Sequence, residues 1–298
     1  MKPEHAVAVA GLGFLLIAGL LLAGSVHRGR QVCKLLAERM PQKYVDLGSP
    51  LPGYFYSVRR DAYFRFIMQR KFEDLTDPHS IMTARDRSVR TLGTWSAVLC
   101  TIFSLAYVLA QLGEWLGLLG SAGGPHSRST SLGLVVLLTP SLLLGVSFVA
   151  LTTSIHYYAE TPLRIWSHLA VAFASMYATL ISLVYYVQLA FVIPRLARGD
   201  AERIELLIFE PFDSFLYAVD VLGYSLMSLS TLFAAAVFKG AGIERWIRWA
   251  LIANGCLIPF LALQMYYPPL IWGGGLWAIT FPTATWLLAI HFSRLKVQ

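Results

Sequence analysis

Charged side chains are scarce in this sequence. Of its 298 residues, 14% are Asp, Glu, Lys or Arg, whereas a soluble domain carries about 25%. The mean hydropathy is +0.60, and several apolar runs reach the length of about 20 residues that a membrane-spanning helix needs. This combination excludes an ordinary soluble domain and predicts a chain that crosses a membrane several times.

Signatures of common enzyme chemistries are also missing. The sequence has no phosphate-binding loop, no Gly-x-Ser-x-Gly, no His-Glu-x-x-His and no Cys-x-x-Cys motif. Cys33, Cys100 and Cys256 have no metal-like spacing, so we expect them to be unpaired. The last apolar run lacks a lysine that could form a retinal Schiff base. The sequence therefore assigns no reaction, and we expect no cofactor.

Seven apolar runs are present, each long enough to cross about 30 Å of hydrocarbon as a helix. Helices are expected because lipid offers no partner for backbone polar groups, and the runs do not alternate as barrel strands do. The sequence thus predicts an all-α polytopic membrane protein with spans at 7–25, 93–119, 132–152, 168–193, 214–238, 248–267 and 270–292.

The distribution of positive charge predicts the orientation of these spans. With the N-terminus outside, 19 of the 24 lysine and arginine residues fall in inside segments and five fall in outside segments. Cytoplasmic loops carry such an excess, so the pattern predicts N-out, C-in with seven spans. The net charge of +7 is explained by topology, and no nucleic-acid partner is expected. Cleavage of the first span as a signal peptide would export the most basic loop, so we expect it to be retained.

The Gly/Ser-rich segment 120–131 suggests a division of the chain. We predict a two-span unit over residues 1–120, with a basic cytoplasmic loop at 27–92. A five-span helical bundle over residues 132–298 is expected to follow.

Much of the positive charge gathers between the first and second spans. Asp77 and Pro78 form a helix start, and the helix is expected to run into the second span with arginines around its base. One interpretation is that Arg70, Arg85, Arg87 and Arg90 anchor the loop to lipid headgroups. The other is that they form a docking surface for anionic lipid or a cytoplasmic protein.

This region also carries a family resemblance. The stretches "KYVDLGSPLPGYF" and "FIMQRKFEDLTDPHSIMTARDRSVRTL" are similar to universal stress protein B and its small two-span relatives. The resemblance covers roughly residues 1–115, and the five further spans have no counterpart in those proteins; the later part resembles uncharacterised bacterial multi-span proteins. It implies a bacterial inner-membrane protein associated with general stress, without catalytic residues. The matching positions are Tyr44, Val45, Asp46, Gly48, Gln69, Arg70, Asp77, Arg85, Arg87 and Arg90.

Asp220 is the most informative single residue, because it lies inside the fifth predicted span. A charge at mid-bilayer costs about 2.5–3.5 kcal/mol on insertion scales, so such a residue is a functional candidate. Asp213, Tyr217, Tyr224 and Ser228 share one helical stripe with it.

Other polar residues in the spans are expected to face this stripe. The fourth span carries Ser175, Thr179, Ser182 and Tyr186, with Gln188 nearby, and the sixth carries Asn254. Two interpretations remain open: interhelical hydrogen bonds that hold the bundle, or a ligand pocket or proton path centred on the carboxyl group. The candidate ligand-binding residues are Asp220, Tyr224, Tyr217, Asn254, Gln188 and Tyr186.

The segment "SIHYYAETPLRIWSH" supplies His156, Glu160 and His168. His156 and Glu160 are one helical turn apart and so have the spacing of a weak metal site. However, Thr161 and Pro162 interrupt a helix there, and an ordinary solvated loop is the expected arrangement.

Together these observations predict a non-enzymatic bacterial inner-membrane protein, associated with stress. Its five-span bundle is expected to bind a small molecule or lipid, and its basic loop to dock in the cytoplasm. The alternatives are a proton-coupled transporter that uses Asp220, and an intramembrane enzyme that uses His156, Glu160 and His168.

Overall fold

The computed structural model describes residues 78–125, 127–199 and 204–295. Regular structure in these ranges is helical throughout, and no strand occurs within them. Six segments of the described chain are long and apolar enough to span a membrane, namely 87–115, 131–158, 161–196, 215–235, 243–263 and 268–294. The chain is therefore an all-α, multi-pass membrane protein, and the six segments match the predicted second to seventh spans. The predicted first span, 7–25, lies outside the described residues.

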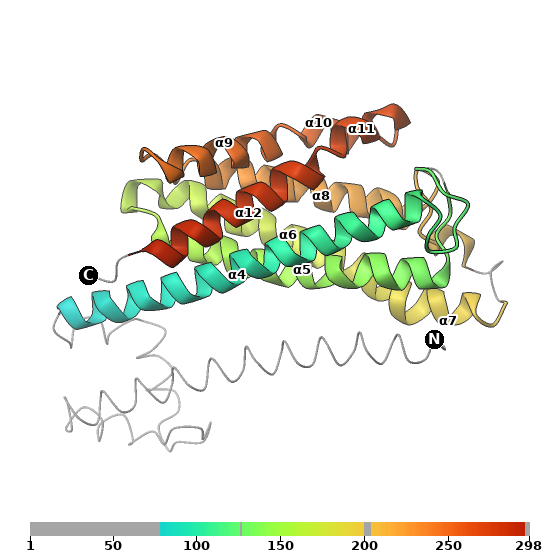
Figure 1. Ribbon diagram of the computed structural model, residues 1–298, viewed down its shortest axis with the longest axis horizontal. Helices are drawn as coiled ribbons and strands as arrows, with labels where there is room; N and C mark the ends of the chain where they lie inside the picture. The colour runs from blue at the N-terminus through green and yellow to red at the C-terminus, as the bar shows by residue number, and fades with distance from the viewer. Residues whose placement is uncertain (1–77, 126, 200–203, 296–298) are drawn as a thin grey trace, which may run out of the picture. The chain divides into compact units, whose positions relative to one another are not determined.

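Figure 1 shows the helices running back and forth along one common direction. In chain order they are α4 (Pro78–Trp115), α5 (Ser131–Tyr158), η1 (Thr161–Leu163), α6 (Arg164–Val187), the π-helical turn η2 (Gln188–Val192), α7 (Ile193–Leu196), η3 (Glu205–Leu207), α8 (Phe215–Ala235), α9 (Ile243–Gly255), α10 (Ile258–Leu263), η4 (Pro268–Leu270), α11 (Ile271–Gly274) and α12 (Trp277–Arg294).

Two of the long helices begin with a side-chain cap at the same end of the bundle. Thr130 accepts a hydrogen bond from the backbone N–H of Gly133 at the start of α5. Ser214 does the same for Tyr217 at the start of α8. Such caps satisfy backbone donors that a helix leaves free in its first turn. They fix where α5 and α8 begin, and therefore how far from this end of the bundle the residues in the first two turns lie.

The helices pack in the order α5–α6–α8–α9–α12, with α10 beside α8 and α11. α4 joins this group through α12: the hydroxyls of Thr101 and Thr285 lie 2.8 Å apart in a buried hydrogen bond. The structure thus places the predicted second span together with the bundle that follows it.

Large apolar side chains cover the outside of the six spans, among them Trp95, Leu109, Leu183 and Trp286. Each is more than half exposed. A soluble monomer rarely exposes so many, whereas lipid-facing helices do. The low content of charged residues in the sequence thus corresponds to an outer surface of apolar side chains.

Candidate functional site

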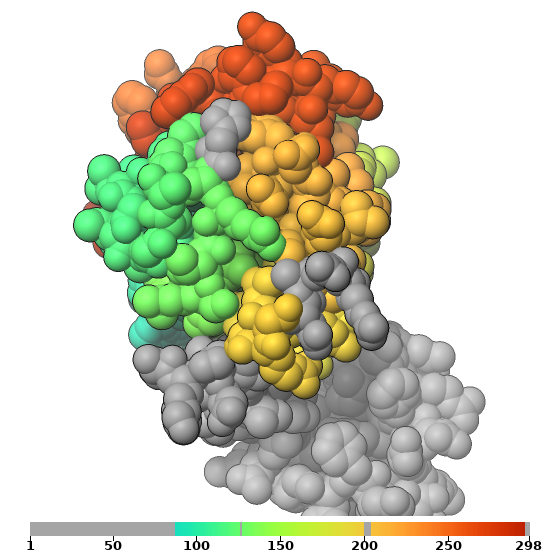
Figure 2. Space-filling model, turned by 90° about the vertical axis from the view of Figure 1, so that its right-hand side faces the viewer, coloured from blue at the N-terminus to red at the C-terminus, as the bar shows by residue number. Residues whose placement is uncertain are grey.

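A cavity of about 410 Å³ lies at one end of the bundle, between α4, α8, α10, α11 and α12. Small-molecule sites usually fall between about 300 and 1,000 Å³. The connecting segments 116–125, 127–130, 204–214 and 264–276 meet at this end, as the space-filling view in Figure 2 shows. The cavity therefore lies at one end of the long helices, beside these segments.

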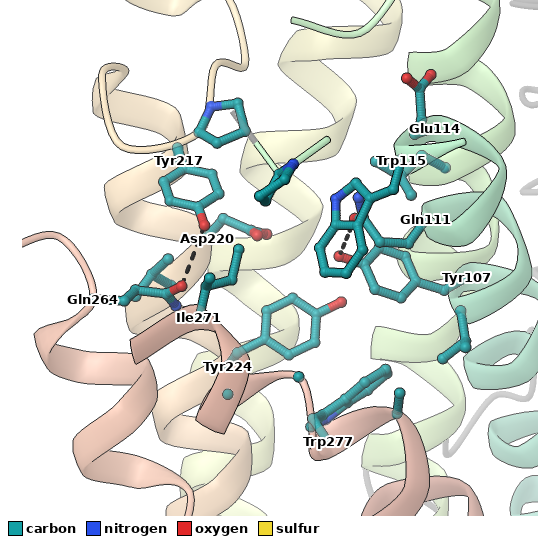
Figure 3. Close-up of a pocket in the computed structure, with 18 of the residues that line it drawn as sticks. Tyr107, Gln111, Glu114, Trp115, Tyr217, Asp220, Tyr224, Gln264, Ile271 and Trp277 are labelled. Carbon is teal, nitrogen blue, oxygen red and sulfur yellow. Dashed lines mark hydrogen bonds between the residues drawn. The ribbon is translucent and has the colours of Figure 1, made fainter. Parts of the chain in front are cut away.

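Asp220 supplies an acidic group to the wall of this cavity. It lies in the second turn of α8 and is 5% exposed, and its Oδ1 atom has no hydrogen-bond partner in the described part of the chain. Figure 3 shows the carboxyl group directed into the space between the labelled aromatic rings.

Tyr217 and Tyr224 flank the carboxyl group on the same face of α8, three residues before and four residues after it. The Tyr217 hydroxyl donates to Gln264 Oε1 at 3.3 Å, which ties α8 to the segment after α10. The ring of Phe209 meets the Tyr217 ring at 5.5 Å. This side of the cavity is therefore held by both a hydrogen bond and ring packing.

Three aromatic rings form the inner end of the cavity. Tyr107 of α4, Tyr224 of α8 and Trp277 of α12 have ring centroids 5.3 to 6.2 Å apart, and both tyrosines meet Trp277 edge to face. The Tyr224 hydroxyl also receives a hydrogen bond from Tyr185 at 3.3 Å. We call Tyr107, Tyr224 and Trp277 the aromatic floor.

The aromatic floor rests on a further layer of rings. Trp277 stacks on Phe281 at 5.2 Å, and Tyr224 meets Tyr177 at 5.6 Å. Phe148 of α5 contacts both of these deeper rings. These deeper side chains are at most 2% exposed and do not line the cavity, so the cavity ends at the aromatic floor.

Glu114 is a second buried acid in the cavity wall, at 3% exposure, and neither of its carboxyl oxygens has a hydrogen-bond partner among the described residues. Its carboxyl group packs against Gly133 in the first turn of α5, where a Cβ atom would overlap it. In Figure 3 the carboxyl group points away from the other labelled side chains. Negative charge is favourable at a helix N-terminus, so we assign Glu114 to the contact between α4 and α5 and Asp220 to the cavity.

The last two spans are both interrupted, and the interruption of the seventh span lies beside the cavity. The sixth breaks between α9 and α10, at Cys256 and Leu257, and the seventh breaks between α11 and α12, at Gly275 and Leu276. Gly275 and Leu276 line the cavity directly. Discontinuous spans tend to mark binding sites in transporters, because irregular backbone within a membrane is tolerated where it lines a cavity.

Three of the candidate ligand-binding residues from the sequence line this cavity together. Asp220, Tyr217 and Tyr224 lie together because they share a face of α8. Gln188 and Asn254 are fully buried, but neither lines the cavity.

These two amides instead hold neighbouring segments together. Gln188 donates to the backbone carbonyl of Leu207 and accepts from the backbone N–H of Phe209 at 3.3 Å. Asn254 donates to Thr231 at 3.1 Å and accepts from Thr280 at 3.0 Å, linking α8, α9 and α12.

The expected orientation of the polar stripe on the fourth span is wrong. Tyr186 is 67% exposed and lies on the outer face of α6, with Ser175 and Thr179. The two hydroxyls donate to backbone carbonyls one turn earlier in their own helix, both at 2.9 Å. Because short hydroxyls satisfy themselves in this way, they need no partner from another helix.

The residues of the weak metal site do not form one. Among the described residues, no group of three or more His, Cys, Asp or Glu side chains is placed to hold a metal ion. The rings of His156 and His168 are 4.3 Å apart, and His156 Nδ1 lies 2.9 Å from Ser167 Oγ. Glu160 is exposed, ahead of η1.

The arginines of the basic loop are described only in part. Arg87 and Arg90 are exposed on α4. Arg85 lies in α4 as well, at a position whose side chain is not described, and Arg70 lies outside the described residues. The docking surface therefore stays a prediction.

Several cavity residues were not predicted. Tyr107, Gln111 and Glu114 recur at helical spacing in the second span, which is the kind of stripe that drew attention to α8. Trp277 follows the interruption of the seventh span and Gln264 follows the end of α10, and no periodic signal marks either residue.

No family model, no curated protein and no solved structure matches this chain. The site therefore has to be interpreted from its own geometry.

Proposed function

We propose that this chain is a multi-pass membrane protein that binds a small molecule in the cavity centred on Asp220. One observation carries the proposal: a carboxyl oxygen is buried without a partner from the described residues, in a cavity large enough for a ligand. Buried polar groups are normally hydrogen-bonded, and an exception needs an explanation. A ligand that bonds to Asp220 supplies one.

Native mass spectrometry tests this proposal on protein purified in mild detergent. We expect a defined molecule to accompany the wild type and to be lost from Asp220→Asn. Ser228→Ala is the matched control, because Ser228 is also buried on α8, also lacks a described partner, and does not line the cavity. The same bulk lipid on all three proteins would contradict a binding site.

Proton-coupled transport is a second candidate, supported by the interruptions in the last two spans, one of which lines the cavity. In this mechanism Asp220 carries the proton and the interrupted spans move. In liposomes that enclose a pH-sensitive dye, the wild type should move protons when its substrate is added, and Asp220→Asn should not. Substrate binding without proton movement would support the binding function and contradict proton-coupled transport.

We also propose an N-out, C-in orientation in a bacterial inner membrane and an association with stress. The charge distribution supports the orientation, and the stretch from Tyr44 to Arg90 supports the rest through its resemblance to universal stress protein B. With this orientation, the loop 116–130 and the cavity lie on the outer side.

A further inference from the structure

The charges and rings of the cavity specify the class of ligand. We infer that the cavity binds an organic cation, a protonated or quaternary amine that carries an apolar group. This inference rests on the proposed binding function and adds the chemistry of the ligand to it.

Charge is the first step of the argument. The described residues that line the cavity include Asp220 and Glu114 but no lysine or arginine. An anionic ligand would meet a carboxylate with no compensating cation, in surroundings where charges interact strongly. A buried carboxylate is costly unless it is paired, and a cationic ligand supplies the missing partner.

The aromatic rings are the second step. Tyr217 and Tyr224 stand on either side of the Asp220 carboxyl group, and Trp277 adjoins Tyr224 at 5.3 Å. A cation within about 6 Å of such a ring is attracted by its negative face, most strongly when it is desolvated. A carboxylate set among several rings is therefore suited to a substituted ammonium group. The charge can pair with the carboxylate, and the alkyl substituents can contact the ring faces.

The same surroundings argue against a metal ion. Calcium takes six to eight oxygen ligands and magnesium takes six, whereas a single carboxylate faces the centre of this cavity. No cluster of three or more ligating side chains occurs in the described part of the chain. The rest of the wall near Asp220 includes Val221, Leu261, Ile271 and Leu276, which provide contact for an apolar group.

Pairs of probes that match in shape and differ in charge test this inference. Choline is paired with 3,3-dimethylbutan-1-ol, and 2-phenylethylamine is paired with 2-phenylethanol. Binding is measured by isothermal titration calorimetry in nanodiscs of uncharged lipid at neutral pH. We expect at least one cation to bind about tenfold or more tightly than its neutral partner.

Variants then locate the effect. Asp220→Asn should lower the affinity for that cation by about tenfold or more, while Asp220→Glu should retain part of it and Ser228→Ala should match the wild type. Because the paired probes need only the wild-type protein, the test holds even if Asp220→Asn does not fold.

Equal or tighter binding of the neutral partner in both pairs, or no binding of any probe, would overturn the inference. Failure of this inference and failure of the proposed binding function give different results. A neutral molecule that co-purifies with the wild type and is absent from Asp220→Asn would refute the cation and keep the binding site.

Discussion

The contact between Glu114 and Gly133 can be tested with Gly133→Ala, which should destabilise the wild type and stabilise a variant without the Glu114 carboxyl group. A Cβ atom on Gly133 would overlap the Glu114 carboxyl group, so Gly133→Ala forces α4 and α5 apart or displaces the acid. Overpacking costs about 1–3 kcal/mol, while alanine gains about 0.5–1 kcal/mol over glycine inside a helix. We expect a net loss of about 1–2 kcal/mol in the free energy of unfolding.

Removing the acid should reverse the effect. In a Glu114→Ala background the three atoms nearest to the added Cβ are gone, so Gly133→Ala should now stabilise by about 0.5–1 kcal/mol. The double-mutant cycle should therefore give a coupling of about 1.5–3 kcal/mol. The free energies come from SDS titration of unfolding in mixed micelles, followed by circular dichroism.

Gly145→Ala is the control on the same helix. The nearest atom to its added Cβ would be 3.5 Å away, at Ala178, which is an ordinary contact. It should therefore stabilise by about 0.5–1 kcal/mol, the gain of alanine over glycine inside a helix, with or without Glu114. If Gly133→Ala behaves like Gly145→Ala in both backgrounds, the Glu114 side chain does not lie against α5 and our division of roles between the two acids is wrong.

Three further predictions concern hydrogen bonds and topology. Gln188→Leu should lower the free energy of unfolding by about 2 kcal/mol, because two buried backbone groups lose their partner. It should also speed limited proteolysis near residues 204–209, and unchanged cleavage would show that Gln188 does not hold this segment. Asn254→Leu should cost about 1–2 kcal/mol in SDS titration without altering the ligand found by native mass spectrometry, and loss of that ligand would place Asn254 in the site. In a cysteine-free background, Ser127→Cys should react with a membrane-impermeant maleimide on intact cells and Ser293→Cys should react only after lysis, whereas the opposite pattern would invert the proposed orientation.

The sequence located the six described spans because a long apolar run has few alternatives to a membrane helix. It also grouped Asp220 with Tyr217 and Tyr224, because spacing within one helix sets which side chains share a face. Both inferences depend on local geometry, which is encoded over a few turns.

Contacts between helices were harder to predict. The stripe with Ser175 and Thr179 suggested an inward face, yet those hydroxyls bond within their own helix and α6 buries Tyr177 and Tyr185 instead. The cavity also draws on α4, which was assigned to another unit, and on residues beside the interruption of the seventh span. Which segments meet in space depends on the packing of the whole bundle, and no single stretch of sequence contains it.

The aromatic floor closes the cavity toward the other end of the bundle. Beneath Tyr224 and Trp277, the buried rings of Tyr177 and Phe281 fill the bundle, so in this conformation they close the direct way from Asp220 to the opposite end of the bundle. A receptor or sensor can work in this way without further change. A carrier cannot, because passage to the opposite face would require these stacked rings to swing aside, and a cross-link that pins Trp277 to its neighbours would then arrest transport while sparing occupancy.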